Sequence, residues 1–403
     1  MLLPLRERLI ADLGDASMKP IAQLEFRALP FLVSMMHTGM PINAGAWLER
    51  SDSSFAEVRE LEGKLDTLAG TKGKWGSPEV VAEVLKARGR PVESTGTEVL
   101  AQLDDEFAQL VLAYRQAAKR ANTYGSDWLA KYVSDTTGRV HTSYLQLGAV
   151  TGRLSSRAPN LQNLPREAFY RNAVVAPEGR VLIKADYSQV ELRIAAALSG
   201  DKRMLKAYAT GADLHRVTAA KVLGIPEDQV DKRARQLAKA INFGLIYGMS
   251  ATGLQRYASS TYGVHMTEVE AGRYRSAFFG HYPGLRKWHR AQPDGEIETR
   301  TLLGRRRLAV SRFTFKLNSP DQGSGADGLK LAMARLWEDR AAAPGVVPIL
   351  TVHDELVVEC PADRADGTAE WLKGHMVAGM SEAVRELVPI DVEVQTGRTW
   401  GGA

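Results

Sequence analysis

Basic and aromatic residues recur at a spacing of four between Arg235 and Tyr247. The segment has the sequence RQLAKAINFGLIY, in which Lys239 and Phe243 occupy the two intermediate positions. Four residues advance about 40° around an α-helix, so the four side chains share one broad face. Such a face can hold a polyanion at one end and stack an aromatic ring at the other, as a nucleotide requires. The alternative is an amphipathic helix with a solvated basic edge.

The composition is that of an ordinary soluble globular protein. The chain has 403 residues, 44% hydrophobic and 25% charged, which leaves room for two or three subdomains. A net charge of +5 and a pI near 9.1 are compatible with a polyanionic partner. Cys360 is the only cysteine, which excludes an internal disulfide and a cysteine metal cluster. With no long apolar run and no apolar leader at the N-terminus, we expect a cytoplasmic protein without membrane contact.

The order of periodic segments predicts an α+β fold. A helix is expected near 21–37, and long helical patterns follow over 44–124, interrupted at 70–78 and 89–96. Mostly helical sequence also fills 187–292. Short apolar or alternating runs predict strands at 139–144, 180–185, 346–352, 355–359 and 390–395. A small sheet built from distant segments would thus lie between two helical lobes.

Two aspartates are expected at strand ends. Asp186 follows the apolar run 181–185, and Asp354 lies between two apolar runs that predict a tight hairpin. If these strands are neighbours, the carboxylates converge on a site suited to a pair of Mg²⁺ ions, which prefer oxygen ligands. Two ions about 3.5–4 Å apart stabilise the attacking and leaving oxygens of a phosphoryl displacement. For either aspartate alone, a turn or a helix cap is the alternative.

Seven segments, in sequence order, resemble those of the family A DNA polymerases, the DNA polymerase I type. Three look like its polymerase motifs, namely 186–193 (DYSQVELR), 235–247 and 352–356 (VHDEL). The others are 151–156 (TGRLSS), 159–165 (PNLQNLP), 213–216 (DLHR) and 318–323 (NSPDQG). The resemblance implies a right-hand polymerase with an antiparallel palm sheet and helical thumb and fingers. The implied parts are a lead-in and palm start at 1–43, the thumb at 44–135, the palm at 136–200 and 301–403, and the fingers at 201–300.

The resemblance also implies the reaction, template-directed addition of deoxynucleotides to a primer 3′-hydroxyl. Asp186, Asp354 and the Tyr187 backbone carbonyl would hold two Mg²⁺ ions, for which Mn²⁺ could substitute. The primer hydroxyl would attack the α-phosphate, and pyrophosphate would leave. Glu355 is acidic and adjacent, and whether it binds a metal is left open.

Further residues are implied for the incoming nucleotide, a deoxynucleoside triphosphate. Arg235, Lys239 and His215 would grip the triphosphate as fixed cations. Phe243 would pack on the sugar and base, Tyr247 would lie by the template base, and Gln189 belongs to the same set. Glu191 would close the space beside the sugar 2′ position; its alternative is an ordinary acid on a helix surface.

A third set is implied for primer-template DNA. Arg153, Asn163 and Gln322 would contact the minor groove, where acceptors lie at similar positions for every base pair. Arg115 and Lys119 would touch the primer backbone, although a solvated basic helix face is the alternative. His353 would lie near the primer end or serve as a structural hairpin histidine. The enzyme is expected to act as a monomer in a bacterial or phage-infected cell.

Several positions depart from the family pattern. The segment between Arg307 and Asn318 is shorter than in bacterial members of the family. Asp321 stands where an apolar residue is usual, and Gly325 is expected to loosen the helix after Gln322. The acidic run 104–106 is expected to lie in helical sequence, too isolated for a second metal site. Because the sequence ahead of the expected thumb is also too short for an exonuclease domain, we expect neither a proofreading exonuclease nor a 5′ nuclease in this chain.

Three other functions remain open from the sequence. A single-subunit RNA polymerase shares the metal pair, but Glu191 beside the sugar favours deoxynucleotides. A phosphohydrolase using His353 and Asp354 would normally place those ligands on helices. A noncatalytic primer-template binding protein would keep the basic surfaces and lack the metals.

Overall fold

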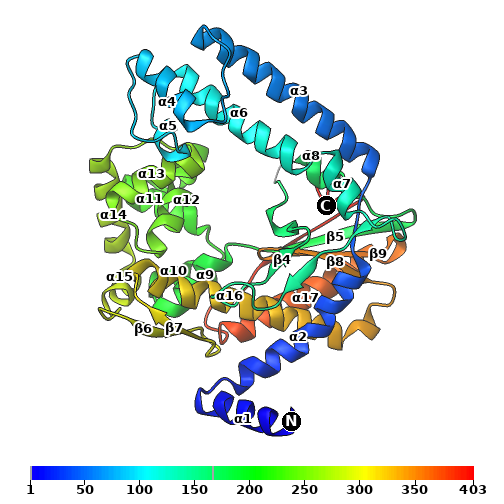
Figure 1. The fold of residues 1–403 in the computed structure, drawn as a ribbon. Helices are drawn as coiled ribbons and strands as arrows, with labels where there is room; N and C mark the ends of the chain where they lie inside the picture. Colours follow the sequence, from blue (N-terminus) through cyan, green and yellow to red (C-terminus); the bar gives the residue numbers. More distant parts are fainter. Residues whose placement is uncertain (1, 166–167) are drawn as a thin grey trace.

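A four-stranded antiparallel sheet forms the palm in the computed structural model, which describes residues 2–165 and 168–403 (Figure 1). Its strand order is β10 (Val392–Gly397), β5 (Arg180–Tyr187), β9 (Glu355–Pro361), β8 (Val347–Val352). The sheet joins segments from both halves of the chain, which confirms the predicted α+β class. One detail of the prediction was wrong: β5 runs two residues beyond 185, so Asp186 lies within the strand. The extension is stabilised because Tyr187 pairs with Val392 of β10.

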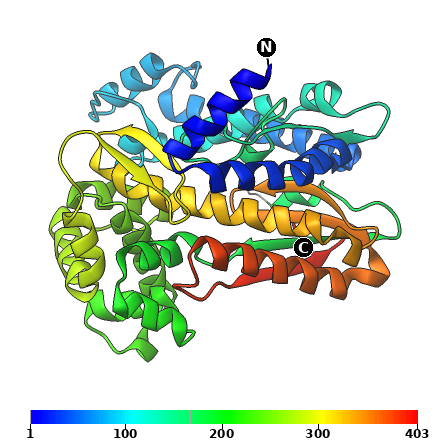
Figure 2. The same cartoon turned by 90° about the horizontal axis from the view of Figure 1, so that it is seen from below.

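Three helices pack beside the sheet. α17 (Ala365–Ala383) contacts β5 and β10, α2 (Lys19–Thr38) contacts β8, and α16 (Phe313–Glu338) lies between these two helices (Figure 2). The expectation that Gly325 loosens α16 was wrong, because the helix is continuous through it. Its neighbours 326–334 are all buried, so packing rather than helix propensity holds this stretch.

The lobe that the family resemblance implies to be the thumb is called the thumb lobe below. It is built on two long helices that cross the top of Figure 1, α3 (Ala44–Ala69) and α6 (Glu106–Thr123). Asn43 and Asp105 accept hydrogen bonds from the first-turn amides of these helices and so fix their starts. The acidic run 104–106 is therefore a helix start, not helix interior as expected. Shorter helices complete the lobe: α4 (Pro78–Ala87), α5 (Thr97–Leu100) and α7 (Ser126–Tyr132).

The lobe that the family resemblance implies to be the fingers is called the fingers lobe below. Its helices lie on the left of Figure 1. It comprises α10 (Lys202–Ala209), α11 (Leu214–Leu223), α12 (Lys232–Ile246), α13 (Ala251–Tyr262), α14 (Glu268–His281) and α15 (Pro283–Arg290). α9 (Val190–Ser199) leads into it from β5, and α13 contacts α5 at the tip of the thumb lobe.

Short hairpins and single helices connect these parts. β1 (Met40–Pro41) pairs with β2 (Arg139–Val140), β3 (Ser143–Leu145) with β4 (Ser155–Arg157), and β6 (Ile297–Arg300) with β7 (Arg306–Val310). The strand expected at 139–144 is thus split, because its two ends have different partners. Within residues 2–165 and 168–403, the remaining helices are α1 (Leu2–Asp15), α8 (Ala168–Asn172) and four 3₁₀ turns, Leu161–Asn163, Glu227–Gln229, Arg340–Ala342 and Ala362–Arg364. Among the helices of the described residues, none has the length and hydropathy needed to cross a bilayer.

Candidate active site

Asp186 and Asp354 meet at one end of the palm sheet. In the β5–β9 ladder Asp186 lies opposite Glu355, the residue that follows Asp354. Val352 pairs with Glu355, so His353 and Asp354 form the two-residue connection of the β8–β9 hairpin. His353 adopts a left-handed conformation with φ 57°, which makes this tight connection possible. The strands therefore bring together two carboxylates that are far apart in the sequence.

The electrostatics of this pair suit divalent cations. Burial raises the pKa of both carboxyl groups, and for Asp186 the charge of Asp354 raises it further. Asp186 Oδ1 is buried without a hydrogen-bond partner among the described residues. In the described part of the chain, no group of three or more His, Cys, Asp or Glu side chains forms a metal cluster. Two carboxylates completed by backbone and substrate oxygens form the kind of site that Mg²⁺ accepts.

Glu355 is held by protein groups. One carboxylate oxygen accepts a hydrogen bond from the Trp400 indole, and the other lies 3.4 Å from Arg171 Nη1. The guanidinium of Arg171 also lies over the Trp400 ring, 4.2 Å from its centroid. These contacts assign Glu355 to the support of the hairpin that carries Asp354.

The predicted face of α12 is present. Arg235, Lys239 and Phe243 are partly exposed, whereas Ala238 and Asn242, which lie between them in sequence, are buried. Tyr247 lies one residue beyond the end of the helix, and it is also partly exposed. The exposed side and the buried side of the helix thus both follow the four-residue spacing found in the sequence.

Arg235 is oriented by Asp213, a residue to which the sequence motifs assign no role. Arg235 Nε donates to Asp213 Oδ2 at 2.7 Å, and Asp213 Oδ1 accepts from the backbone amide of His215 at 2.9 Å. Asp213 is the N-cap of α11, and that capping position is visible in the sequence. Its contact with Arg235 is a tertiary one and has no local signature.

His215 is a buried side chain, only 2% exposed. Burial lowers its pKa to about 4, which favours a neutral ring over the fixed cation expected from the sequence. The Asn242 amide donates to His215 Nδ1 at 2.8 Å, which leaves the ring proton on Nε2. Asn242 also accepts from the Thr218 hydroxyl at 2.9 Å, so a buried amide, missed in the sequence, fixes the tautomer.

Residues from four segments line a cavity of about 160 Å³ beside Asp354. Arg153, Glu191, Gln322 and His353 lie in its wall, and Arg153 Nη2 donates to Glu191 Oε1 at 2.7 Å. An adjoining hollow of about 340 Å³ shares some of these residues and adds Gln189 and Phe243. Glu191 is half-buried. Part of the predicted nucleotide set, namely Gln189, Glu191 and Phe243, thus lies next to Asp354 together with the predicted DNA contacts Arg153, Gln322 and His353.

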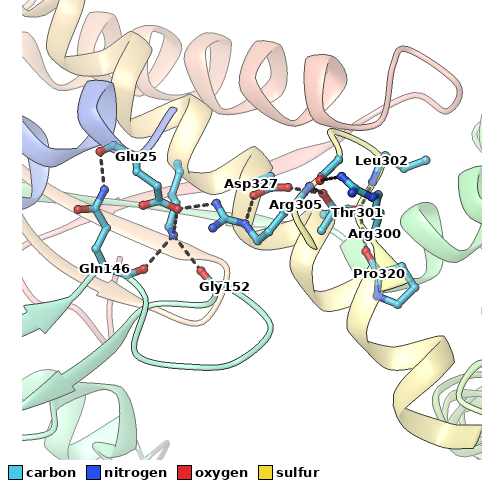
Figure 3. Close-up of polar contacts among 12 residues, drawn as sticks. Glu25, Gln146, Gly152, Arg300, Thr301, Leu302, Arg305, Pro320 and Asp327 are labelled. Carbon is cyan, nitrogen blue, oxygen red and sulfur yellow. Dashed lines mark hydrogen bonds and ion pairs between the residues drawn. The ribbon is translucent and has the colours of Figure 1, made fainter. Parts of the chain in front are cut away.

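The loop that carries Arg153 is fixed by a buried ion cluster formed by Glu25, Arg305, Asp327 and Lys330 (Figure 3). The Lys330 ammonium donates to Glu25 Oε1 at 2.6 Å and to the Gly152 carbonyl at 2.9 Å. Arg305 Nε donates to Asp327 Oδ1 at 2.6 Å. Because Gly152 immediately precedes Arg153, the cluster sets the direction from which Arg153 enters the cavity.

The remaining predicted DNA contacts lie elsewhere. Asn163 and Lys119 line a separate hollow of about 640 Å³ where the thumb lobe meets the palm. Arg115 donates to the carbonyl and hydroxyl of Thr95, just before α5. In this structure Arg115 therefore braces the tip of the thumb lobe.

Comparisons with known proteins agree with this geometry. Residues 46–402 match the sequence profile of DNA polymerase family A. DNA polymerase I of Aquifex aeolicus is 41% identical over 315 residues, covering 76% of this chain and 53% of its own length. DNA polymerase I of Pseudomonas aeruginosa is 37% identical and covers 95% of this chain and 44% of its own. The chain therefore spans about half the length of these relatives.

A solved structure shares the whole architecture. It is the POL domain of Pol1 from M. smegmatis in complex with DNA primer-template and dNTP, with a TM-score of 0.86 and 30% sequence identity. The match covers 100% of this chain and 74% of the other. On its sequence and its fold, the chain belongs to DNA polymerase family A.

Proposed function

We propose that this chain is a DNA-directed DNA polymerase that adds deoxynucleotides to a primer 3′-hydroxyl. The observation that carries the proposal is the meeting of Asp186 and Asp354 at one end of the sheet, with a buried oxygen of Asp186 left without a partner. The two hollows beside Asp354 are lined by some of the residues that resemble the family's nucleotide and minor-groove contacts, among them Glu191, Phe243 and Gln322. The similar POL domain was solved with primer-template and dNTP, which supports the same partners here.

Asp186, Asp354 and the Tyr187 carbonyl would hold two Mg²⁺ ions, or Mn²⁺ in their place. When bound, the ions would supply charge stabilisation to the attacking and leaving oxygens. Arg235 and Lys239 would hold the triphosphate as cations, whereas neutral His215 would donate a hydrogen bond from Nε2. Phe243 would pack on the nucleotide, with Gln189 beside it.

The remaining assignments concern the sugar and the duplex. Glu191, held by Arg153, would close the 2′ side of the sugar. Gln322, Asn163 and His353 would contact the primer-template, and Lys119 and Arg115 would approach its backbone. We further propose that the protein is a cytoplasmic monomer. We also propose that the 403 residues carry no proofreading activity.

A primer-extension assay with Mg²⁺ tests the proposal. Asp186→Asn and Asp354→Asn should each lower the extension rate at least about a thousandfold, because either change removes a ligand of both ions. Primer-template binding, followed by fluorescence anisotropy, should stay within a few-fold of the wild type. Asp363→Asn is the matched control, since Asp363 is an exposed palm carboxylate.

Three outcomes would count against the proposal. Normal extension by either site variant would refute the metal assignment. Equal use of ribonucleotides would favour an RNA polymerase, and nucleotide hydrolysis without primer would favour a phosphohydrolase. Addition of EDTA should stop extension and leave DNA binding intact.

A further inference from the structure

Asp321 is a fully buried carboxyl group that reaches the end of the fingers helix. It lies on α16 and is 0% exposed, and the Tyr247 hydroxyl donates to its Oδ1 at 3.3 Å. Its Oδ2 is buried without a partner among the described residues. Since an unsatisfied buried oxygen is costly, an apolar side chain of similar size would give a more stable protein at this position.

The backbone around Tyr247 is fixed on two sides. His289 Nε2 lies 3.0 Å from the Ile246 carbonyl and donates to it. Gly248, with φ 76°, lies so close to α16 that an added Cβ would be 2.5 Å from the Phe313 ring. Because the backbone of residue 247 is fixed in this way, the contacts of the Tyr247 hydroxyl determine the orientation of the ring.

The Tyr247 hydroxyl lies between two acids. The charges of Asp321 and Glu191 both raise the pKa of Tyr247, after burial. Asp321 and Glu191 line the same cavity, where Glu191 is also bound by Arg153. Burial, followed by the charge of Glu191, raises the pKa of Asp321 well above its usual range. Asp321 thus accepts the hydrogen bond of the Tyr247 hydroxyl from the wall of the cavity that Glu191 also lines.

We propose that Asp321 is a positioning residue that holds the Tyr247 hydroxyl on α16 and so fixes the wall of the sugar site at Glu191. The inference rests on the proposed function, because the wall matters only if Glu191 faces a nucleotide sugar. It goes beyond that function by assigning a role to a carboxyl group that stands where the family usually has an apolar residue. Through Tyr247, Asp321 would sharpen the choice of deoxynucleotides over ribonucleotides.

The test compares kcat/KM for dCTP and CTP opposite a template guanine. Asp321→Leu should lower the ratio of the two values about fivefold, the effect of losing one hydrogen bond of ordinary strength. Tyr247→Phe should lower it by a similar factor, and the double variant should be no worse than either single one, because both changes remove the same contact. Asp321→Asn should stay within about twofold of the wild type, since an amide accepts the same bond and is neutral.

Thermal unfolding without DNA separates positioning from a merely structural role. Asp321→Leu should raise the Tm while it lowers discrimination, whereas a residue that only supports the fold would lower both. In a double-mutant cycle of the wild type, the two single variants and the double variant, the effects of Asp321→Leu and Tyr247→Phe on the Tm should be non-additive.

The inference fails if Asp321→Leu leaves the sugar ratio unchanged while Tyr247→Phe lowers it. It also fails if the two substitutions add, in the ratio or in the Tm. If the wild type adds no nucleotide at all, the proposed function fails; the Tm cycle then still shows whether Asp321 and Tyr247 are coupled.

Discussion

At the residue scale, two polar contacts join α11 to α12 and set the direction of the groups that we expect to meet the triphosphate. Asp213, the N-cap of α11, holds Arg235, and Asn242 on α12 holds His215. Each contact places a charged or polar group at a defined angle before any ligand arrives. Such preorganisation lowers the entropic cost of ordering these side chains when the phosphates bind.

Because His289 is buried, we expect the free energy of unfolding to fall at acid pH. Burial lowers its pKa to about 4, below the unfolded value of about 6.5, so the unfolded chain binds more protons between these pH values. Stability should therefore fall as the pH drops from about 6.5 to 4. In urea unfolding at pH 7, 6 and 5, His289→Gln should flatten this decline by up to about 1.4 kcal/mol per pH unit. A decline as steep as that of the wild type would contradict the assignment.

The sequence indicates the residues of the candidate site more clearly than it indicates the residues that hold them in place. Asp186 and Asp354 are visible because motif and strand pattern coincide at both positions. The partners of Glu355 are not visible, since Trp400 and Arg171 are 45 and 184 residues away along the chain. No local pattern records a contact over such separations, and the same holds for Asp213 with Arg235.

At the element scale, the palm depends on close contact between α16 and α17. A Cβ added at Gly379 would lie 2.4 Å from the Ala332 backbone nitrogen and 3.0 Å from the Gly328 carbonyl oxygen. Glycine therefore lets the two helices approach backbone to backbone. The sequence predicts neither this contact nor the full length of β5, because both depend on which element lies alongside.

Gly379→Ala should destabilise the protein by about 1–3 kcal/mol, because the added methyl forces the two helices apart. Gly374→Ala is a matched control on the same helix, where an added Cβ meets nothing within 4 Å. There the change should stabilise by up to about 1 kcal/mol, through helix propensity. Urea unfolding of both variants measures the difference. An equal effect of the two substitutions would show that the close approach of α16 and α17 at Gly379 does not require glycine.

At the scale of the whole molecule, the buried ion cluster joins parts that are remote in the chain (Figure 3). Glu25 on α2 binds Arg305, which lies 280 residues away between β6 and β7, and Lys330 on α16, which lies 305 residues away. Lys330 also holds the carbonyls of Gln146 and Gly152 at 2.8 and 2.9 Å. One ammonium group thus connects the lead-in helix, the loop bearing Arg153 and the long palm helix.

Lys330→Met tests how much the molecule depends on this connection. Methionine keeps the volume but leaves two carbonyl oxygens without their donor and the carboxylate of Glu25 with less compensation, so the free energy of unfolding should fall by about 3 kcal/mol. Lys64→Met is the control: its pair with Glu60 joins two side chains that are 54% and 67% exposed, so its loss should leave the free energy of unfolding nearly unchanged. Because Gly152 immediately precedes Arg153, Lys330→Met should also weaken primer-template binding at temperatures where the variant remains folded. A variant no less stable than the Lys64→Met control, with unchanged DNA affinity, would mean that packing alone holds these segments together.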